Sequence, residues 1–310
     1  MSAENERISH IPGLSPFSIH MKTLDTLIDD INTLHTQGHK ASDESVQELA
    51  DEMAAAVKRS LERAFETDRG PTLRMSNIGK PARQLWYETH SPPEDKEQLT
   101  GTTLRKFLMG DLWESLLLWL AKEAGHKVEQ HQAEVEIDGI KGHIDAVVDG
   151  VVVDVKSASK FGFEKFRRGT LQDDDAFGYY EQLSGYSSAL GLDGAWLAVN
   201  KETAALTVLH APREDLQALD TAGRISYLRG ALASETPPER CYEPVPDGKS
   251  GNLKLPVGCS YCPFKFKCWA DANSGAGPRT FLYSNGPTYL VHVEKEPNVQ
   301  EAFSNKKENN

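Results

Sequence analysis

The sequence predicts an α/β domain built on a mixed β-sheet flanked by helices, and three observations predict it. Residues 103–124 form an apolar helix, because large apolar side chains recur on almost every side of it. Three short β-branched segments follow at once, over 133–137, 140–148 and 151–157, and favour three antiparallel strands. A further helix (179–190) and two strands (195–200 and 205–210) come next, an order typical of an α/β domain.

The segment from 142 to 157 carries the most chemical information. Its centre is Asp149-Gly150, a dipeptide that favours a two-residue hairpin turn and so sets the register of the two strands. In that register Asp145 faces Asp154, with Cβ atoms about 4.5–5.5 Å apart. Two such carboxylates repel each other, and a hard divalent cation such as Mg²⁺ would remove the repulsion. Lys156 lies two residues after Asp154 and therefore on the same face of the strand.

A second interpretation of this hairpin is structural. On an edge hairpin the same acids would point to solvent from the polar face. The Asp-x-Lys triplet by itself is not specific, because Asp247-Gly248-Lys249 has the same pattern in a segment that is expected to be a loop.

Composition limits the classes of protein to which the chain can belong. The 310 residues are 39% hydrophobic and 26% charged, which is ordinary for a globular protein. No apolar run approaches ~18 residues and the N-terminus lacks the apolar core of a signal peptide, so we expect a cytoplasmic protein without a membrane segment. The net charge of −12 argues against a broadly basic nucleic-acid coat, but a local basic groove or bound metal ions could still contact DNA.

Four regions are expected along the chain. Residues 1–70 contain two helices, over 18–37 and 43–65, that form a helical hairpin packed on the core or on a partner. Residues 71–235 form the core and end in one long amphipathic helix from 213 to 233. Residues 236–275 form a cysteine-containing module, and residues 276–310 contain a β-hairpin followed by a polar, disordered tail.

Polar side chains on two of the predicted helices are candidates for the same site. Glu114 lies in the middle of the apolar helix, and acids are seldom fully buried unless they are paired or bind a metal. The alternative is a glutamate beside a local gap in the packing. Gln182 and Tyr186 are four residues apart and therefore share one face of the helix over 179–190.

Two clusters that mix basic and aromatic residues are candidates for DNA contact, because such clusters can hold a nucleic-acid strand. The first lies beside Trp86 and Tyr87, where the alternative is a helix docked by its aromatic rings. The second lies in a long polar loop that starts where the hairpin around Asp149-Gly150 ends, and an ordinary solvated loop is the alternative there. The basic residues are Lys80 and Arg83 in the first cluster, and Lys160, Lys165, Arg167 and Arg168 in the second.

All four cysteines of the chain lie within the 28 residues 241–268, in a segment rich in proline, glycine and lysine. In a reducing cytoplasm a metal centre is favoured over disulfides for such a group, and four thiolates suit Zn²⁺ or a [4Fe–4S] cluster. Scattered core cysteines are the alternative. The cysteines are Cys241, Cys259, Cys262 and Cys268, and the last three have the spacing C-x₂-C-x₅-C.

Together these motifs resemble the RecB-like and Cas4-like branch of the PD-(D/E)xK exonucleases, particularly phage-encoded members. The resemblance covers roughly residues 72–269 and depends on the order and spacing of five motifs. They are Gly110-x₃-Glu114, Gly142-His143-Ile144-Asp145, Asp154-Val155-Lys156, Gln182-x₃-Tyr186, and the cysteine pattern followed by Trp269.

The resemblance implies a restriction-endonuclease-like core and metal-assisted hydrolysis of DNA by Mg²⁺ or Mn²⁺. Glu114, Asp145, Asp154 and the main-chain carbonyl of Val155 would hold the metal. Lys156 would orient or deprotonate the attacking water, and Gln182 and Tyr186 would position the strand, while the second basic cluster would follow the DNA backbone. The Cas4-like cysteine spacing favours [4Fe–4S] over zinc.

The chain departs from this family in two respects. Many relatives have histidine where Glu114 stands, which leaves the first metal ligand open. Cas4-like relatives have their first cluster cysteine upstream of the core, whereas MSNIGKPARQLWYE has none. Cys241 would then supply the fourth thiolate, and the cluster could not join the two ends of the chain as it does in those relatives.

The function expected from the sequence is a metal-dependent DNA exonuclease in phage DNA recombination, repair or degradation, acting in the host cytoplasm on single strands or duplex ends. Three alternatives remain: a Cas4-type factor of CRISPR adaptation, a restriction-like endonuclease, and a non-catalytic DNA-binding module with a structural zinc. The Gln-x₃-Tyr element and the cysteines disfavour the endonuclease. An oligomer, and a single-strand-binding or recombination protein as partner, stay open.

Overall fold

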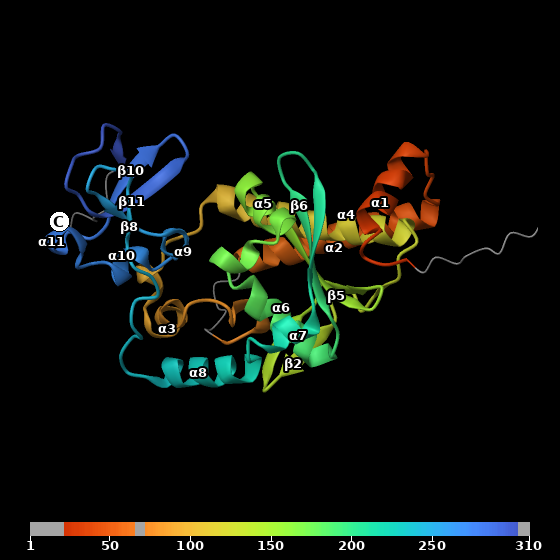
Figure 1. Cartoon of the computed structure of the whole chain (residues 1–310), viewed down its shortest axis with the longest axis horizontal. Coiled ribbons are helices and arrows are strands. Elements are labelled where there is room, and N and C mark those ends of the chain that lie inside the picture. The colour runs from red at the N-terminus through yellow and green to blue at the C-terminus, as the bar shows by residue number, and fades with distance from the viewer. Residues whose placement is uncertain (1–21, 66–71, 303–310) are drawn as a thin grey trace, which may run out of the picture.

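The protein is described by a computed structural model that covers residues 22–65 and 72–302. At its centre is a five-stranded sheet in the order β1-β4-β5-β6-β7, in which β5 and β6 are parallel and the other pairs are antiparallel. Helices lie on both faces of this sheet (Figure 1), which confirms the predicted mixed α/β class. The strands are β1 (Val128–Glu129), β4 (Ala146–Val148), β5 (Val151–Ala158), β6 (Gly194–Asn200) and β7 (Leu206–Ala211).

The hairpin between β4 and β5 has the turn that the sequence predicts. Asp149 and Gly150 have φ angles of 50° and 84°, and positive φ at both central residues is what a type I′ turn requires. Val148 pairs with Val151, as expected, and the register continues to the pair of Ala146 and Val153.

The two faces of the sheet bury different helices, because neighbouring residues of a strand point to opposite sides. Val153 and Val155 of β5 pack with Leu117 and Ala121 of α4. Val152 and Ala158 pack on the other face, in the same cluster as apolar residues of α5 and α6. The helices are α1 (Leu27–Thr36), α2 (Asp43–Phe65), α4 (Gly101–Glu123), α5 (Lys160–Arg168) and α6 (Tyr179–Leu190).

The N-terminal helices pack on the core, one of the two arrangements that the sequence left open. Both α1 and α2 contact α4, and α1 also reaches β7. Leu27 and Ile31 of α1 are buried in the cluster that contains α4. The first helix begins at Leu27 rather than at Ser18, and residues 18–21 lie outside the described residues, as does the predicted tail beyond 302.

The apolar helix predicted over 103–124 is only partly buried. Its C-terminal half is buried, but Phe107 and Met109 in the first half are 55% and 51% exposed. The first half of α4 extends beyond the sheet, and an all-round apolar pattern cannot show where a helix leaves the layer that covers it.

The predicted three-stranded meander is divided between two sheets. β2 (Glu134–Ile137) and β3 (Ile140–His143) form a separate two-stranded sheet, and Asp138 and Gly139 turn between them as predicted. The strand expected over 140–148 is interrupted at Ile144 and Asp145, which separate β3 from β4.

Two further predictions about secondary structure were wrong. The polar segment after β5 begins with α5 instead of a loop: Ser159 accepts a hydrogen bond from Gly162 N at its start, and Gly169, with φ of 68°, ends it. The single helix expected over 213–233 is broken at Asp220, whose φ is 45° and whose side chain caps the second part. The two parts are α7 (Arg213–Gln217) and α8 (Thr221–Ala233).

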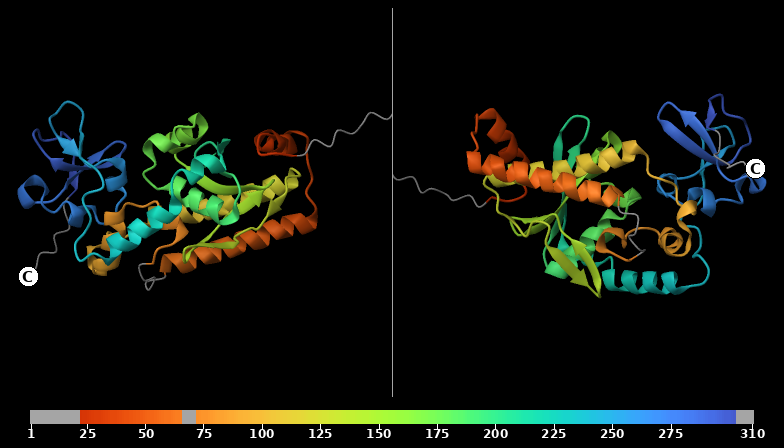
Figure 2. Two further views of the ribbon diagram at one scale, coloured as in Figure 1. Left: turned by 60° about the horizontal axis from the view of Figure 1, so that its bottom comes forward. Right: turned by 180° about the vertical axis from the view of Figure 1, so that it is seen from behind.

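The C-terminal part of the chain forms a second, antiparallel sheet in the order β12-β10-β11-β9-β8. It lies to one side of the central sheet, next to α3 (Figures 1 and 2). The hairpin predicted within residues 276–310 is β10–β11, which turns at Ser284 and Asn285, and β9 from the cysteine segment pairs with β11. The elements are β8 (Val245–Pro246), β9 (Leu253–Lys254), α9 (Val257–Ser260), α10 (Lys265–Cys268), α11 (Ala272–Gly275), β10 (Arg279–Tyr283), β11 (Gly286–His292) and β12 (Glu301–Ala302).

Upstream residues hold this C-terminal part against the core. The ring of Tyr87 stacks on that of Phe264 at 5.7 Å, and Glu97 N donates to Pro263 O at 2.9 Å. The buried Lys265 forms an ion pair with Glu97. The upstream elements are η1 (Met75–Asn77), α3 (Ala82–His90) and η2 (Pro93–Asp95), and η3 (Leu171–Asp174) precedes α6.

Among the described residues, no helix combines the length and the apolar character that crossing a bilayer requires.

Gly142 is required where β3 passes η1 and α6. A Cβ atom at this position would lie 2.4 Å from Met75 Cβ and 2.9 Å from Tyr186 Cε1. We therefore expect Gly142→Ala to lower the free energy of unfolding by about 1–3 kcal/mol, the usual cost of overpacking.

Gly230→Ala is the matched control for this substitution. Gly230 lies in α8 with no atom within 4 Å of an added Cβ, so alanine should raise helix stability there by up to about 1 kcal/mol. Urea denaturation of both variants measures the difference. Equal stabilities would contradict the close approach of β3 to η1.

Candidate active site

The candidate site forms where β4 and β5 stop pairing. β5 carries Asp154 and Lys156 on one face, and Lys156 Nζ lies 2.5 Å from Asp154 Oδ2. The same-face placement of the two residues is therefore as predicted. Asp154 is only 2% exposed, and its Oδ1 atom has no hydrogen-bond partner among the described residues.

Asp145 does not pair with Asp154 as the next rung of the ladder, contrary to the predicted register. The β4–β5 ladder ends at the pair of Ala146 and Val153. Beyond it, the side chain of Asp145 bonds to the β5 backbone: its Oδ2 accepts a hydrogen bond from Val155 N at 2.7 Å. The side chain thus satisfies a β5 amide and remains beside Asp154, close enough for each charge to affect the other.

Glu114 reaches the same site from the middle of α4, where its side chain is 17% exposed. Gly110, one turn earlier, faces β5, and a Cβ there would lie 3.5 Å from Ser157 Oγ. This is an ordinary contact distance, so an alanine would also fit between α4 and β5. Glu114 Oε1 accepts a hydrogen bond from Gln132 Nε2 at 2.5 Å, so the position of this acid is fixed.

The charges of the site act on one another strongly because they are buried together. The pKa of Glu114 is raised to about 7, mainly by burial and also by Asp111 and Asp154, against the opposing effect of the Gln132 hydrogen bond. Burial is also the main cause of the raised pKa of Asp145, with Glu114 and Asp154 adding to it. Three carboxyl groups therefore share one site that disfavours three negative charges.

Lys156 is a cation that lowers the pKa of all three acids. Burial lowers its pKa, but Asp154 and then Asp145 outweigh burial, so the pKa is raised and the side chain is charged at neutral pH. The ring of Tyr179 lies 5.0 Å from Lys156 Nζ and gives the ammonium group a cation–π contact.

Gln182 and Tyr186 lie on the side of α6 that faces the acids. Gln182 Nε2 donates to Tyr186 Oη at 3.2 Å. Tyr186 is 2% exposed, and burial raises its pKa, with Asp154 and Asp145 raising it further against the Gln182 hydrogen bond. The shared face that the sequence predicts is present, while a role in positioning a strand stays a prediction.

Two residues of the site were missed by the sequence analysis. Gln132 bonds to Glu114 with its side chain and donates its backbone N–H to Asp145 O at 3.1 Å, from a loop position with φ of 52°. No pattern in the sequence marks it. Tyr179 begins the predicted helix, and its position one turn before the Gln-x₃-Tyr pair was the only available signal.

The predicted DNA-contacting side chains are divided between two places. On α5, Lys165 Nζ lies 2.6 Å from Asp174 Oδ2, and Arg167 and Arg168 both pair with Glu164. Near α3, Lys80 lies 3.4 Å from Glu88, whereas Arg83 turns toward the cysteines. DNA contact by these residues, and by Lys160 at the start of α5, stays a prediction.

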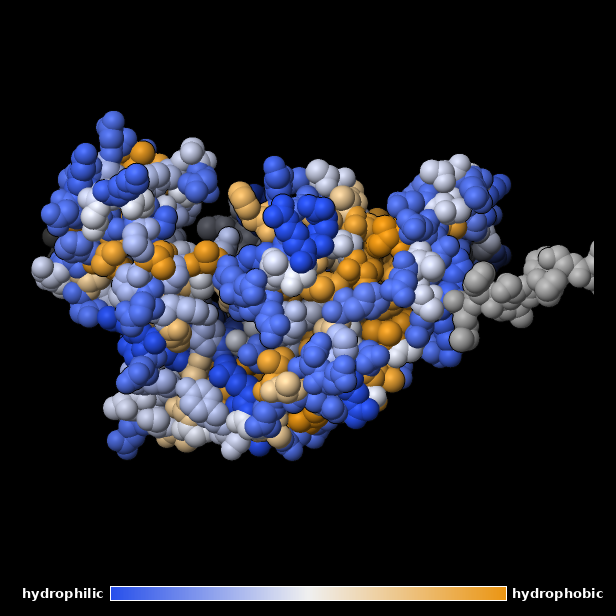
Figure 3. All heavy atoms as spheres, in the orientation of Figure 1, coloured by the Kyte–Doolittle hydropathy of each residue, from blue (hydrophilic) through white to orange (hydrophobic). Residues whose placement is uncertain are grey.

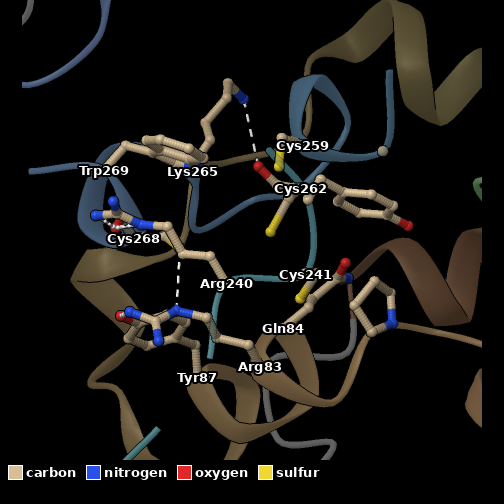
Figure 4. A pocket seen from close by; sticks show the side chains of 13 residues that line it. Arg83, Gln84, Tyr87, Arg240, Cys241, Cys259, Cys262, Lys265, Cys268 and Trp269 are labelled. Atoms are coloured by element: carbon tan, nitrogen blue, oxygen red, sulfur yellow. Dashed lines mark hydrogen bonds between the residues drawn. The ribbon is translucent and has the colours of Figure 1, made fainter. Parts of the chain in front are cut away.

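The four cysteines line one cavity of about 30 Å³ together with α3. Figure 4 shows the sulfur atoms of Cys241, Cys259 and Cys262 turned toward the same space. The fourth, Cys268, lines the cavity and accepts a hydrogen bond from Arg83 Nε at 3.2 Å. The clustering follows from the fold and excludes the alternative of scattered core cysteines.

Each sulfur atom of the cavity has an N–H donor nearby. The backbone of Arg83 and Gln84 at the start of α3 lowers the pKa of Cys241, the backbone of Phe264 that of Cys262, and the side chain of Trp269 that of Cys259. These donors favour thiolates, but burial is stronger and raises the pKa of Cys259 to about 11 and that of Cys262 to about 12.

Neither the acids nor the cysteines have the geometry of a complete metal site in the part of the chain that the structure describes. As the side chains stand in the described residues, no group of three or more His, Cys, Asp or Glu side chains is arranged to hold a metal ion. The donor types nevertheless fit two kinds of ion: carboxylate oxygens with an unpartnered buried atom suit a hard divalent cation, and four sulfurs suit a thiophilic metal.

Comparison with known proteins gives distant structural likenesses. No family model and no curated protein matches the chain. Among solved structures, SSO0001 matches at 17% identity and a TM-score of 0.37, over 68% of this chain and 93% of that chain.

Two of the other matched structures are exonucleases. A phage-related exonuclease from Haemophilus somnus matches at 16% identity and a TM-score of 0.34, over 51% of this chain and 92% of its own. The alkaline exonuclease of Laribacter hongkongensis matches at 12% identity and a TM-score of 0.30, over 50% of this chain and 88% of its own. The likeness is distant. The RecB-like and Cas4-like branch that the motifs indicate stays a prediction.

The hydrogen bond from Val155 N to Asp145 generates a prediction about the metal-free protein. Asp145→Asn retains a side-chain oxygen that can accept this bond but removes one buried negative charge. We expect unchanged stability or a gain of about 0.2–1 kcal/mol, because the repulsion between acids is relieved. Asp145→Ala leaves the Val155 N–H without a partner and should cost about 1–3 kcal/mol.

Urea denaturation in EDTA distinguishes these outcomes. If asparagine destabilised the protein as much as alanine, the charge of Asp145 would itself be stabilising the fold, and the site would not be one of excess negative charge.

Proposed function

We propose that the protein is a metal-dependent deoxyribonuclease of the PD-(D/E)xK type, acting as an exonuclease. The observation that carries the proposal is the convergence of Glu114, Asp145, Asp154 and Lys156 from α4, the β3–β4 connection and β5. Folding alone disfavours three carboxyl groups in one buried site. A divalent cation and a phosphodiester would use both the acids and the lysine.

The three acids and the Val155 carbonyl would hold one or two Mg²⁺ or Mn²⁺ ions. When bound, such an ion polarises a phosphoryl oxygen and lowers the pKa of a coordinated water. The unpartnered Oδ1 atom of Asp154 supports this assignment, because a buried carboxylate oxygen without a hydrogen bond is costly unless a cation contacts it.

Lys156 and the α6 pair would act on the substrate. Lys156, whose Nζ lies 2.5 Å from Asp154 Oδ2, would orient or deprotonate the attacking water. It would stabilise the charge that develops when water adds and the phosphorus–oxygen bond breaks. Gln182 and Tyr186, beside the acids, would orient the strand.

The biological setting is the finer part of the proposal. The order of the motifs favours the RecB-like and Cas4-like branch and a phage enzyme of DNA recombination, repair or degradation. Activity on end-labelled linear DNA and none on a closed circle would support exonuclease action, and cleavage of the circle would contradict it.

Substitution of the β5 residues tests the active site. We expect Asp154→Asn and Lys156→Ala each to reduce Mn²⁺-dependent cleavage by about 100-fold or more, because each removes a group that acts on the reacting phosphate. Melting temperatures report whether the variants remain folded. Wild-type cleavage rates in either variant would exclude this site.

The second Asp-x-Lys triplet of the chain supplies a matched control. Lys249 is exposed in a turn between β8 and β9, far along the chain from the three acids. Lys249→Ala should leave cleavage unchanged. A protein that binds DNA but shows no cleavage in any variant or in the wild type would favour a non-catalytic DNA-binding module.

We further propose that the four cysteines hold a [4Fe–4S] cluster, with Zn²⁺ as the alternative. The support is the common cavity, the N–H donor at each sulfur, and the Cas4-like spacing. The surrounding apolar cluster is small, with Leu255, Trp269 and Val291 as its buried members, so the module needs a further stabilising element.

Purification without oxygen tests the cysteine centre. We expect brown protein with a broad absorbance near ~400 nm and about four irons per chain. Cys262→Ser should lower the melting temperature and weaken DNA binding, while Mn²⁺ binding to the acids stays unchanged because α4, the β3–β4 connection and β5 hold those residues. Colourless protein with one zinc per chain would overturn the iron assignment and retain the four-ligand site.

A further inference from the structure

Two aromatic rings, one from the cysteine module and one from the core, contact each other. Tyr261 lies inside the C-x₂-C segment, between Cys259 and Cys262, and Phe177 lies just before α6. Their ring centroids are 5.4 Å apart at an interplanar angle of 53°. Tyr261 is nevertheless 70% exposed and Phe177 is 48% exposed, so each ring keeps much of its surface in water.

The pair continues directly to the candidate active site. Phe177 stacks on Tyr179 with centroids 5.5 Å apart and an angle of 27°. The ring of Tyr179 in turn lies 5.0 Å from Lys156 Nζ. Three rings thus form one aromatic track, Tyr261–Phe177–Tyr179, that runs from the surface of the cysteine module to the lysine of β5.

Packing alone does not account for the outer end of this track. Rings that join two parts of a fold gain stability from burial, yet here the two outer rings leave large apolar faces in solvent. On the same molecule, Phe264 and Tyr87 make the corresponding contact between α3 and the cysteine module and are 2% and 6% exposed. Exposed rings that lead to a site indicate a ligand with flat apolar faces.

The charges near the track indicate which part of a nucleic acid would face it. Asp173, Asp174 and Asp175 lie two to four residues before Phe177, and only Asp174 has a lysine partner, Lys165 at 2.6 Å, among the ion pairs of the described residues. Such a border repels phosphates. Bases carry no charge, and they stack on aromatic rings regardless of sequence.

We propose that the track Tyr261–Phe177–Tyr179 guides an unpaired DNA strand to Lys156, with bases stacked on the two exposed rings. The inference rests on the proposed nuclease function and gives it a substrate class: a single strand or an unpaired end. A duplex keeps its base faces inside the helix and cannot offer them to the track except at a terminus. The cysteine module then has a direct part in substrate binding, because it positions Tyr261.

Fluorescence anisotropy with a labelled oligothymidylate of about 20 nucleotides tests the track in EDTA, where no cleavage occurs. We expect the wild type to bind this strand more tightly than a blunt hairpin duplex. Phe177→Ala and Tyr261→Ala should each weaken single-strand binding by about 5- to 100-fold, the range that loss of one stacked base produces. Phe177→Trp and Tyr261→Phe should retain it, because a ring remains.

Phe266→Ala is the matched control. Phe266 is also an aromatic residue of the cysteine module, 40% exposed, and it packs on Tyr289 with centroids 5.8 Å apart, away from the track. Its loss should leave single-strand binding unchanged. Melting temperatures of the alanine variants show whether the module remains folded.

The outcomes separate this inference from the proposed function. Equal binding of single strand and duplex by the wild type, or alanine variants of the track that bind like Phe266→Ala, would overturn the inference, even if the wild type cleaves DNA in Mn²⁺. Ring-dependent binding of the single strand by a wild type that cleaves no DNA would support the strand path and overturn the nuclease.

Discussion

The bond from Val155 N to the carboxylate of Asp145 is the interaction on which the site depends. The backbone pairing of β4 with β5 stops at Ala146 and Val153, and beyond that pair the side chain of Asp145 accepts the hydrogen bond of a β5 amide. Because the acceptor is a carboxylate instead of a carbonyl, the sheet gains its hydrogen bond and keeps a negative charge beside Asp154. The arrangement is costly in the metal-free protein, since burial and neighbouring acids raise the pKa of Asp145.

The packing around this bond serves to hold the acids together. Gly142 allows β3 to pass Met75 and Tyr186, and Gln132 ties Glu114 to the backbone of Asp145. Each of these contacts restricts the motion by which the acids could separate and relieve their repulsion. A site that is organised in this way before it binds a cation loses little conformational freedom on binding.

The sequence predicted the elements better than it predicted where they end. The turn at Asp149-Gly150 and the helix ending at Gly191 depend on local backbone preferences, which neighbouring residues determine. The interruption of the strand at Asp145 and the role of Gln132 depend on contacts between distant segments, and no local pattern encodes them. α5 was not predicted because its two buried phenylalanines, Phe163 and Phe166, lie among many charges, although Ser159 caps its first turn.

The cysteine module also combines a local pattern that the sequence reveals with contacts between distant segments that it does not. The spacing of the cysteines predicted a common site, but it could not predict that α3 would close the cavity. The upstream stretch has no cysteine, yet it joins the module through hydrogen bonds from Arg83 and from the backbone of α3 to two of the sulfurs. The stretch upstream of the core therefore contributes no thiolate to the cysteine site, as expected, but it does contact the site through N–H groups.

The module and the active site are joined physically as well as along the chain. Apolar residues gather over α9 and α10 (Figure 3), next to the loop that carries Tyr261. A metal held by the four cysteines would fix the C-x₂-C loop, and that loop places Tyr261 against Phe177. Loss of the metal would then free the outer end of the aromatic track while the β5 residues stayed in place, so the cysteines would control access to a site that they do not touch.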